Sequence, residues 1–408
     1  MKILFLTHYF PPEGNAPASR VYEMAKRWVG AGHEVTVITC APNVPNGEIY
    51  EGYQNKLRQV EQIDGIRVVR VWTYMAANKG AFLRIINFLS YMVSAVVFGI
   101  FEKRSDIVIA TSPQFFCGWA GIILSRLRGL KCILEIRDIW PESIVAVGAG
   151  LGDRTIRFLE WLEMKMYKYP CHIVTVGRGY QGRLIEKGVP KKKIDVVTNG
   201  VDRDFYQVSP VDKELLLEHG LEGKFVCSYI GTIGMACGLD VVIRAAEILS
   251  QAGETHFHFL LVGDGAMREE LEQRCRDQKL NNITWVGRKP KQDMPRYLAA
   301  SDVCLVHLKN TELFKTVLPS KIFEACAMER PIILGVEGNA AEVVQEAQAG
   351  ICIEPENEIE LVAALRRLHA DPELCQHYGR SGRSHVLEHY DRDQLAADYL
   401  KIIQEVLL

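Results

Sequence analysis

The chain has 408 residues, of which 48% are hydrophobic and 24% are charged, and its formal net charge is -2. This length suits two domains of about 200 residues each better than one core. The composition excludes a disordered chain, and the charge gives no reason to expect a nucleic-acid partner.

The eleven cysteines show no CxxC pair and no Cys/His spacing typical of a zinc site. Most of them lie inside apolar runs, where a free thiol behaves as a small hydrophobic side chain. This usage favours a reduced, cytoplasmic compartment. The apolar run at residues 3–6 is too short for the core of a signal peptide and predicts a buried strand instead.

The first half alternates β-branched runs with helical segments, a pattern typical of a parallel sheet covered on both faces. A helix is expected at residues 18–30, where Gly30 and Gly32 end it. Strands are expected at residues 2–6, 33–39, 66–71, 107–110, 131–136, 172–176 and 196–198. The turn dipeptide Asn199-Gly200 then ends this half.

The most apolar segment, residues 85–101, is preceded by Arg84 and followed by Lys103 and Arg104. A helix that spans a bilayer needs about 20 apolar residues, so this length is marginal. The first expectation is a buried helix of the first domain. Basic flanks also suit a helix that lies on an anionic bilayer surface. A span is the least favoured interpretation, because later strands must pair beside the first one.

The second half repeats the alternation. Helices are expected at residues 239–252, 267–278, 294–300, 320–327 and 340–348. Strands are expected at residues 225–230, 256–262, 283–286, 303–306 and 331–334. The predicted class is α/β, with two doubly wound, Rossmann-like domains at residues 1–200 and 201–388.

Ligands bind beyond the carboxyl ends of the strands in such sheets, so the two domains are expected to face a cleft that holds the active site. The tail, residues 389–408, predicts one amphipathic helix that returns to cover the first domain. Its apolar face carries Leu395, Tyr399, Ile402, Ile403 and Val406.

Four loops that follow predicted strands carry small or charged residues, and they are residues 11–16, 231–234, 263–265 and 318–325. Glycine lets backbone amides approach an anion closely. The two glycine loops of the second half share one placement, which predicts a phosphate or nucleotide site. The Pro/Gly loop at residues 11–16 is by itself more typical of a plain turn.

The loop at residues 318–325 opens a helix. Ser320 and the first amides can hold a phosphate oxygen, Lys321 can neutralise it, and Glu324 can accept hydrogen bonds from ribose hydroxyls. The alternative is a capping box between Ser320 and Glu324. A binding site is preferred, because a cap leaves the neighbouring glycine loops unexplained.

Several motifs resemble those of the family 4 glycosyltransferases, which have the GT-B fold. They are HYFPPEGNAPASR, GHEVTVIT, VVTNGVD, YIGTIG, LLVGDG, ITWVGR and PSKIFEACAMERPII. The resemblance runs nearly end to end and keeps the family's order. The segment LEIRDIWPES, residues 134–143, is similar to a branch of bacterial fucosamine-type transferases of O-antigen and capsule assembly.

The resemblance implies that Glu324, the second Glu of the family's Glu-seven-residues-Glu motif, binds the donor ribose. It implies that the diphosphate is contacted by Gly231, Thr232 and Gly234, and that the donor pocket is lined by Gly263 and Gly265. It also implies that Gly287 and Arg288 flank the base and that Gly14 lies close to the transferred sugar. The first Glu of the motif falls on Thr316, and a basic residue common in the family falls near Cys237. Lys321 and Arg288 therefore remain to offset the diphosphate charge.

The resemblance implies a transfer that retains the configuration of the sugar. The expected donor is a UDP-sugar that carries an N-acetylated hexose, with or without its 6-hydroxyl group, and the expected acceptor is a polyprenyl-diphosphate-linked saccharide. Lys321, Arg288 and loop amides would stabilise the leaving diphosphate. Asp138, which follows a predicted strand, is expected to orient the acceptor hydroxyl, ahead of Glu142 and Arg137. The alternative role of Asp138 is an N-cap for the next helix.

No cofactor and no metal are expected, because the Asp pairs at residues 202–204 and 391–393 are interpreted as solvated charge. The expected location is cytoplasmic and peripheral on the inner face of the plasma membrane. A UDP-sugar 2-epimerase of the same fold and a non-catalytic GT-B scaffold are the competing interpretations. The chain has no GxSxG motif after a strand, which argues against a serine hydrolase, and no GxGxxG motif after the first strand, which argues against a dehydrogenase.

Overall fold

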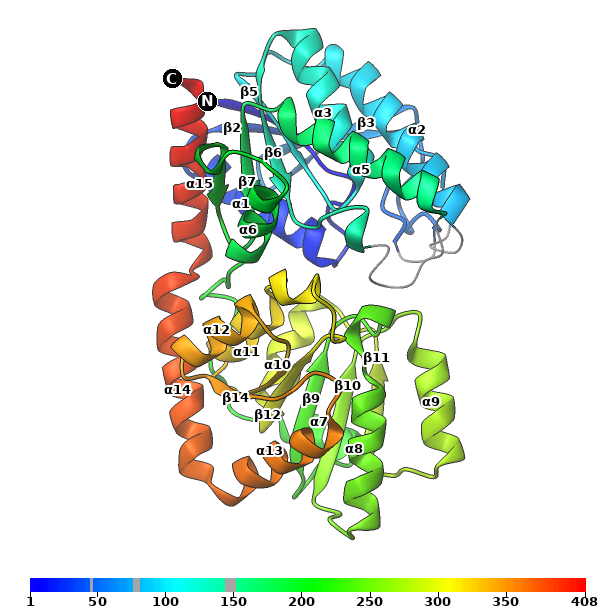
Figure 1. Cartoon of the computed structure of the whole chain (residues 1–408), viewed down its shortest axis with the longest axis vertical. Helices are drawn as coiled ribbons and strands as arrows, with labels where there is room; N and C mark the ends of the chain where they lie inside the picture. Colours follow the sequence, from blue (N-terminus) through cyan, green and yellow to red (C-terminus); the bar gives the residue numbers. More distant parts are fainter. Residues whose placement is uncertain (45–46, 76–80, 144–151) are drawn as a thin grey trace. The chain divides into compact units, whose positions relative to one another are not determined.

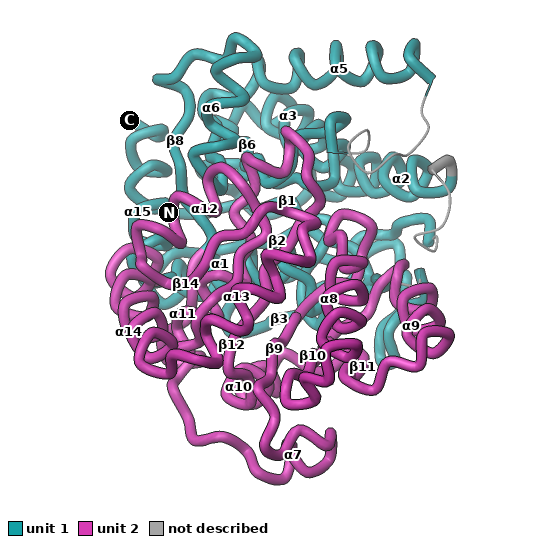
Figure 2. The backbone as a smooth tube through the Cα atoms, turned by 60° about the horizontal axis from the view of Figure 1, so that its bottom comes forward, with its two compact units in different colours: residues 1–199, 392–408 teal, residues 200–391 magenta. Residues whose placement is uncertain are grey.

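The computed structural model describes residues 1–44, 47–75, 81–143 and 152–408. The chain divides into two compact units, and Figure 2 draws them in teal and magenta. Unit 1 comprises Met1–Asn199 together with Arg392–Leu408, and unit 2 comprises Gly200–Asp391.

Unit 1 is built on one sheet, whose described strands follow the order β3-β4-β2-β1-β5-β6-β7-β8. The strands are β1 (Lys2–Leu6), β2 (Glu34–Cys40), β3 (Arg58–Ile63), β4 (Ile66–Val71), β5 (Ile107–Thr111), β6 (Lys131–Ile136), β7 (His172–Thr175) and β8 (Ile194–Val196). All neighbouring pairs are parallel except β3 with β4. The prediction of a parallel sheet therefore holds apart from one antiparallel edge strand.

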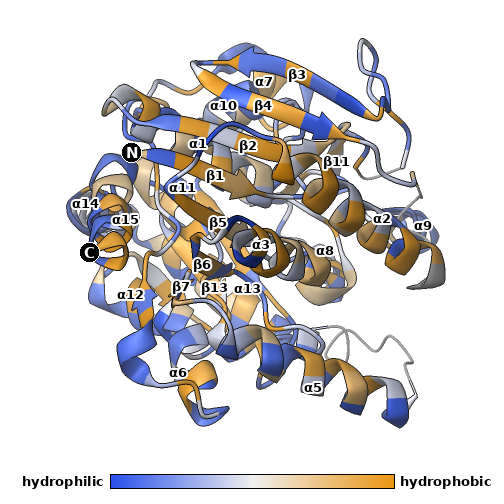
Figure 3. Cartoon of the chain, turned by 90° about the horizontal axis from the view of Figure 1, so that it is seen from above, coloured by the Kyte–Doolittle hydropathy of each residue, from blue (hydrophilic) through white to orange (hydrophobic). Residues whose placement is uncertain are grey.

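Helices cover both faces of this sheet (Figures 1 and 3). They are α1 (Ala16–Gly30), α2 (Ala81–Ile100), α3 (Phe115–Arg128), α5 (Asp153–Lys168), α6 (Arg178–Glu186) and α15 (Arg392–Leu407). On one face, α1 and α15 share a core with β1 in which Trp28 packs against Phe5 and Tyr399. On the other face, α2 and α3 enclose a core with Leu4, Leu6 and Tyr91.

Local signals explain where α1 begins and how α15 is held. The Asn15 side chain accepts a hydrogen bond from the amide of Ala18, at 2.9 Å, and so caps α1. On α15, the side chains of Leu395, Tyr399 and Ile403 are buried against the core. The predicted apolar face of the tail helix is therefore confirmed.

The structure corrects the first expectation for residues 85–101. In α2, only 22% of the residues from Leu83 to Ile100 are buried, although the window has a mean hydropathy of 1.8. One side of the helix packs on the sheet, where the Tyr91 hydroxyl donates to the carbonyls of Thr7 and Ile38. The other side is exposed, so α2 is not a buried helix. Its length and composition alone would also allow it to cross a membrane.

Unit 2 is built on a parallel sheet, whose described strands follow the order β11-β10-β9-β12-β13-β14. The strands are β9 (Phe225–Ile230), β10 (Phe257–Val262), β11 (Ile283–Gly287), β12 (Val303–His307), β13 (Ile332–Gly335) and β14 (Gly350–Cys352). The helices are α7 (Lys213–Glu218), α8 (Asp240–Gln251), α9 (Arg268–Asp277), α10 (Met294–Ala299), α11 (Lys321–Ala327), α12 (Asn339–Glu346), α13 (Glu358–Ala370) and α14 (Pro372–His389). The β9 strand lies between β10 and β12, which is where the strand order changes direction.

The structure also corrects the interpretation of Asp391 as solvated charge, whereas Asp393 is exposed as expected. Asp391 is 3% exposed and forms an ion pair with Arg203 inside unit 2. Asp393 lies in unit 1 and pairs with Arg27 of α1 at 2.5 Å. These carboxylates therefore anchor the two ends of the segment at which the chain passes from unit 2 to unit 1.

Candidate functional site

The carboxyl edge of the unit 2 sheet brings together the loops predicted to bind the donor. The loop from Gly231 follows β9, the loop from Gly263 follows β10, and the segment that leads into α11 follows β12. The loops after β9 and β12 stand at the change of strand order. Open α/β sheets bind their ligands at this position.

The two glycine loops are interlocked through their backbones. The Ile233 amide donates to the Asp264 carbonyl at 3.0 Å, and the Met267 amide donates to the Ile233 carbonyl at 3.1 Å. A Cβ atom on Gly263 would overlap the Gly231 carbonyl, and Gly263 has a φ of +146°. Gly265 is similarly close to Ile233. Contact between the loops thus explains Gly263 and Gly265 without any ligand, which the sequence did not reveal.

We expect Gly263→Ala to displace the Gly231 loop and to weaken nucleotide binding by at least about tenfold, because the added methyl group and the positive φ are both unfavourable. Gly253→Ala is the matched control, since Gly253 also has a positive φ, of +71°, but an open surrounding. Calorimetric titration of both variants with UDP checks this prediction. Equal affinities in the two variants would contradict it.

Lys321 is the first residue of α11 and lies against both the Gly231 loop and β9. A Cβ atom on Gly231 would come within 2.6 Å of Lys321 Cε, so a larger residue there would displace this side chain, and the φ of +138° also favours glycine. Lys321 Nζ lies 3.4 Å from the centroid of the Tyr229 ring, a cation–π contact. Burial lowers the pKa of the Lys321 ammonium to about 8.

This pKa predicts how nucleotide binding depends on pH. The charged ammonium attracts a diphosphate, and it is lost as the pH rises through the pKa. Affinity for UDP should therefore fall between about pH 7 and 9.5, and the fall should shift upward once the bound anion stabilises the charge. Calorimetry across this range checks the prediction. Lys321→Met should have a flatter profile, and an identical slope in the variant would contradict the assignment.

Ser320 and Glu324 adjoin Lys321, and the structure excludes the capping box between them. The Ser320 side chain makes no cap hydrogen bond, and Glu324 is the fourth residue of α11 instead of the third. Glu324 is half-buried and lies close enough to Lys321 to raise its pKa against the effect of burial. The cap alternative is therefore wrong, and both side chains remain candidates for binding.

The remaining predicted donor residues line the same edge. Thr232 is exposed, and its carbonyl accepts hydrogen bonds from the Tyr229 hydroxyl at 2.7 Å and from Cys237 Sγ at 3.2 Å. Gly234 is half-buried and directly precedes a short 3-10 turn. Gly287 ends β11, its carbonyl accepts from the Gly263 amide at 2.9 Å, and the exposed Arg288 follows.

His307, the last residue of β12, also belongs to this edge and was not predicted from the sequence. Its Nε2 accepts the Glu356 amide at 2.8 Å, so Nδ1 carries the proton and donates to the Cys237 carbonyl at 2.7 Å. Burial lowers the pKa of His307, which favours this neutral form. His307 therefore fixes the end of the Gly231 loop. A single histidine at a strand end gives no sequence signal of this role.

At the two positions where the family pattern is broken, the side chains have local partners. Thr316 Oγ1 donates to the Leu313 carbonyl at 2.6 Å within a 3-10 turn. Cys237 is half-buried, and its thiol donates to the Thr232 carbonyl. Neither side chain supplies a charge, which leaves Lys321 and Arg288 as the predicted cations.

In unit 1, the loops after β1, β5 and β6 share the carboxyl edge. Ser112 Oγ accepts the amides of Arg137 at 2.7 Å and of Asp138 at 3.2 Å. The Arg137 guanidinium donates to the carbonyls of Ala16 and Pro17, both at 3.1 Å. The loop with Asp138 is thereby tied to the start of α1. Gly14, just before this start, is exposed and has open space around it.

Asp138 is half-buried, and burial raises the pKa of its carboxyl to about 6 despite hydrogen bonds from the Ser143 side chain and the Ile139 amide. The next described helical residues are Glu142 and Ser143, so Asp138 does not directly precede a helix as an N-cap would. Glu142 is engaged in ion pairs with Arg183 and Lys187. Asp138 thus remains the candidate carboxylate of this edge.

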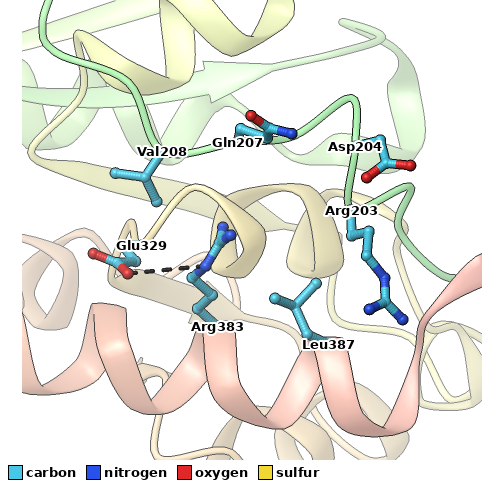
Figure 4. A pocket seen from close by; sticks show the side chains of 7 residues that line it. All are labelled: Arg203, Asp204, Gln207, Val208, Glu329, Arg383 and Leu387. Atoms are coloured by element: carbon cyan, nitrogen blue, oxygen red, sulfur yellow. Dashed lines mark ion pairs between the residues drawn. The ribbon is translucent and has the colours of Figure 1, made fainter.

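A separate cavity of about 480 Å³ in unit 2 is lined by none of the residues of these loops, and Figure 4 shows the side chains that line it. Two arginines line it, and each has an acidic partner: Arg203 pairs with Asp391, and Arg383 lies 3.9 Å from Glu329. Because these charges are already compensated, the cavity does not replace the carboxyl edge as the candidate site. Among the described residues, no three His, Cys, Asp or Glu side chains are grouped to hold a metal ion.

Two family models match successive parts of the chain. Residues 15–200 match the model described as Glycosyl transferase 4-like domain, and residues 213–385 match the model described as Glycosyl transferases group 1. These ranges cover most of unit 1 and most of unit 2, respectively.

Curated proteins and solved structures give the same result. The putative colanic acid biosynthesis glycosyl transferase WcaI of Escherichia coli is 26% identical over 379 residues, which are 90% of this chain and 92% of WcaI. The probable glycosyltransferase WbjE of Pseudomonas aeruginosa is 24% identical over 67% of each chain. The crystal structure of Anabaena HepE in complex with UDP and glucose matches 99% of both chains, with a TM-score of 0.76 at 18% identity. The predicted class of two doubly wound α/β domains is confirmed.

Proposed function

Because this chain is a family 4 glycosyltransferase with the GT-B fold, we propose that it transfers an N-acetylated hexose, 6-deoxy or not, from UDP with retention of configuration. The proposed acceptor is a polyprenyl-diphosphate-linked saccharide of O-antigen or capsule assembly. The name of WcaI, which refers to colanic acid biosynthesis, supports a polysaccharide product. The UDP bound to Anabaena HepE supports the choice of nucleotide.

One observation carries the proposed donor site: the Lys321 ammonium is held against Gly231 and Tyr229 beside two interlocked glycine loops. A cation that has lost part of its hydration binds a diphosphate more strongly than one in open water. Glu324, one turn further along α11, would accept hydrogen bonds from the ribose hydroxyls. The exposed Arg288, after β11, would add a second positive charge near the base.

The proposed reaction needs no second carboxylate. The bond between the anomeric carbon and the diphosphate oxygen breaks, and the acceptor oxygen bonds to the same face of that carbon. The acceptor proton passes to the leaving diphosphate, whose developing charge Lys321 stabilises. We assign unit 1 to the acceptor and Asp138 to orienting its hydroxyl. With a pKa of about 6, the Asp138 carboxyl is ionised at neutral pH and can accept that hydrogen bond.

A lipid-linked acceptor places the enzyme at a membrane, and we propose a cytoplasmic, peripheral location on its inner face. The exposed apolar side of α2 supports this proposal. The proposed function includes no nucleic-acid partner and no cofactor. The UDP-sugar is consumed as a substrate.

A transfer assay tests the proposal. The chain is incubated with radiolabelled UDP-sugars, with and without a polyprenyl-diphosphate saccharide, and the label is followed into the lipid phase. Label in the lipid only when acceptor is present supports transfer. Loss of UDP-sugar with release of an epimer and no need for acceptor would indicate the 2-epimerase. Nucleotide binding without any turnover would indicate the scaffold.

A further inference from the structure

One side of α2 presents large apolar residues to solvent along its length. Leu89, Val93, Val97 and Ile100 are 36%, 57%, 45% and 42% exposed, and Phe101, just after the helix, is 81% exposed. Their spacing of three to four residues puts them on one face. Residues 85–101 contain no charged side chain, so this apolar stripe is not interrupted by charge. An exposed stripe of this kind marks an interaction surface.

A second helix, α5, shows the same feature. Phe158 and Trp161 are 57% and 55% exposed, and their rings stack at 6.1 Å. The opposite side of α5 is buried through Leu159, Met166 and Tyr167. Two large aromatic residues side by side at a solvent-facing position are unusual for a helix that only covers a core.

The helix α3 joins these two surfaces into one layer on the same side of the unit 1 sheet (Figures 1 and 3). Leu124 of α3 packs on Gly99 of α2, where an added Cβ atom would lie only 2.6 Å from Leu124 Cδ2. Met166 of α5 packs in the same way on Gly118 of α3, at 2.8 Å. We call the outer residues of this layer the α2–α5 surface: Leu89, Val93, Val97, Ile100, Phe101, Leu127, Phe158, Trp161 and Met164.

The charged residues around the α2–α5 surface are mainly basic. Exposed basic residues on the three helices and in the turn after α2 are Arg84, Lys103, Arg104, Arg126, Arg154, Arg157 and Lys168. Exposed acidic residues on the same segments are Asp106, Asp153 and Glu160. Lys165 Nζ lies 5.6 Å from the centroid of the Trp161 ring. Apolar and aromatic side chains bordered by Lys and Arg match the interface of an anionic bilayer.

We propose that α2 and α5 dock together on an anionic membrane surface, with Phe158 and Trp161 of α5 as aromatic anchors at the headgroup level. This inference rests on the proposed peripheral location and adds a second helix to it. Docking leaves the fold intact, because Tyr91 and Ala95 keep the inner side of α2 in the core. Spanning the bilayer would break the hydrogen bonds of Tyr91 to Thr7, which follows β1, and to Ile38 of β2.

Co-sedimentation of the full chain with vesicles tests the proposal. The vesicles contain phosphatidylcholine alone or with phosphatidylglycerol, and each is used at low and high salt. Wild type should bind the anionic vesicles, and less at high salt. Phe158→Ser with Trp161→Ser, and separately Val93→Ser with Val97→Ser, should each lower partitioning at least about tenfold. Leu217→Ser with Ile359→Ser is the control, since these unit 2 residues are 62% and 64% exposed.

The outcomes separate the proposal from its alternatives. An α5 variant that sediments like wild type would overturn the role of α5. Absence of vesicle binding by wild type, with a dimer that the α2 and α5 changes dissociate, would assign the surface to a second copy of the chain. Calorimetry with UDP on the same variants should give the wild-type affinity. Vesicle binding without nucleotide binding in wild type would refute the donor site and leave the α2–α5 surface standing.

Discussion

Lys321→Met should lower kcat/KM for the UDP-sugar by roughly 10²–10³-fold, most of it in kcat, because a preorganised charge acts on the leaving group in the transition state. Methionine keeps the length and the apolar stem that packs against Gly231 and Tyr229. The loss of kcat/KM in Lys321→Met therefore reports the effect of the missing charge and not of a cavity. Steady-state kinetics with wild type and variant are the measurement.

Two further variants sharpen this prediction. Lys224→Met is the control, since Lys224 lies just before β9 at the opposite edge of the sheet and donates to the Thr255 carbonyl. It should change kcat/KM by less than about twofold. Lys321→Arg keeps the charge but not the shape, and the bulkier guanidinium should not fit against Gly231 without loss of rate. Full activity of Lys321→Met would remove Lys321 from the reaction.

Arg20→Met should destabilise unit 1 by about 3–5 kcal/mol, since it leaves a buried carboxylate without its partner. The Arg20 and Glu135 side chains are 4% and 1% exposed, and Nη2 of Arg20 lies 3.1 Å from Oε2 of Glu135. Arg20 also donates to the carbonyls of Val197 and Thr198, both at 2.7 Å. One guanidinium thus joins α1, β6 and the segment just before the chain passes from unit 1 to unit 2.

Urea unfolding followed by tryptophan fluorescence measures this effect, because five of the six tryptophans belong to unit 1 and only Trp285 belongs to unit 2. Adding Glu135→Gln to Arg20→Met should recover part of the lost free energy of unfolding, since the unpaired charge is then gone. A double variant as unstable as the sum of the two single variants would show that the ion pair is not the cause.

The same pair predicts a pH dependence of stability. Burial alone raises the pKa of the Glu135 carboxyl, but the charges of Arg20 and Arg137 and hydrogen bonds from Arg20 and Thr111 outweigh it and lower the pKa. The stabilisation is therefore present above the ordinary carboxyl pKa of about 4.3 and is lost as the pH falls through the folded value. Wild type should lose more free energy of unfolding in acid than Arg20→Met does.

The sequence predicted most strands because, apart from β3, both sheets are parallel and largely buried, so that most strands are apolar runs. It missed β3, whose residues Arg58–Ile63 alternate between exposed and half-buried and pair antiparallel with β4 through the Asp64-Gly65 turn. That turn dipeptide was the available signal. It also missed β14, since Gly350–Cys352 is only three residues long.

The sequence predicted where the residues of the candidate site lie in the sheet, but not which of them contact one another. Spacing from strand ends located Lys321, Gly231 and Gly263 at one edge. It did not show that Gly263 makes room for another loop, or that His307 holds the end of the Gly231 loop, because both depend on residues far apart in the chain. The ion pair of the buried Asp391 with the exposed Arg203 was missed for the same reason.

Calorimetric titration of wild type and Glu324→Ala with UDP, GDP, ADP and dTDP tests the central claim most directly, namely that the carboxyl edge of unit 2 binds a uridine nucleotide. We expect wild type to bind UDP in clear preference to the other three nucleotides. Glu324→Ala should lose at least about tenfold in affinity for UDP, because the hydrogen bonds to the ribose are missing. Binding of no nucleotide by the folded wild-type chain, or unchanged UDP affinity in Glu324→Ala, would contradict it.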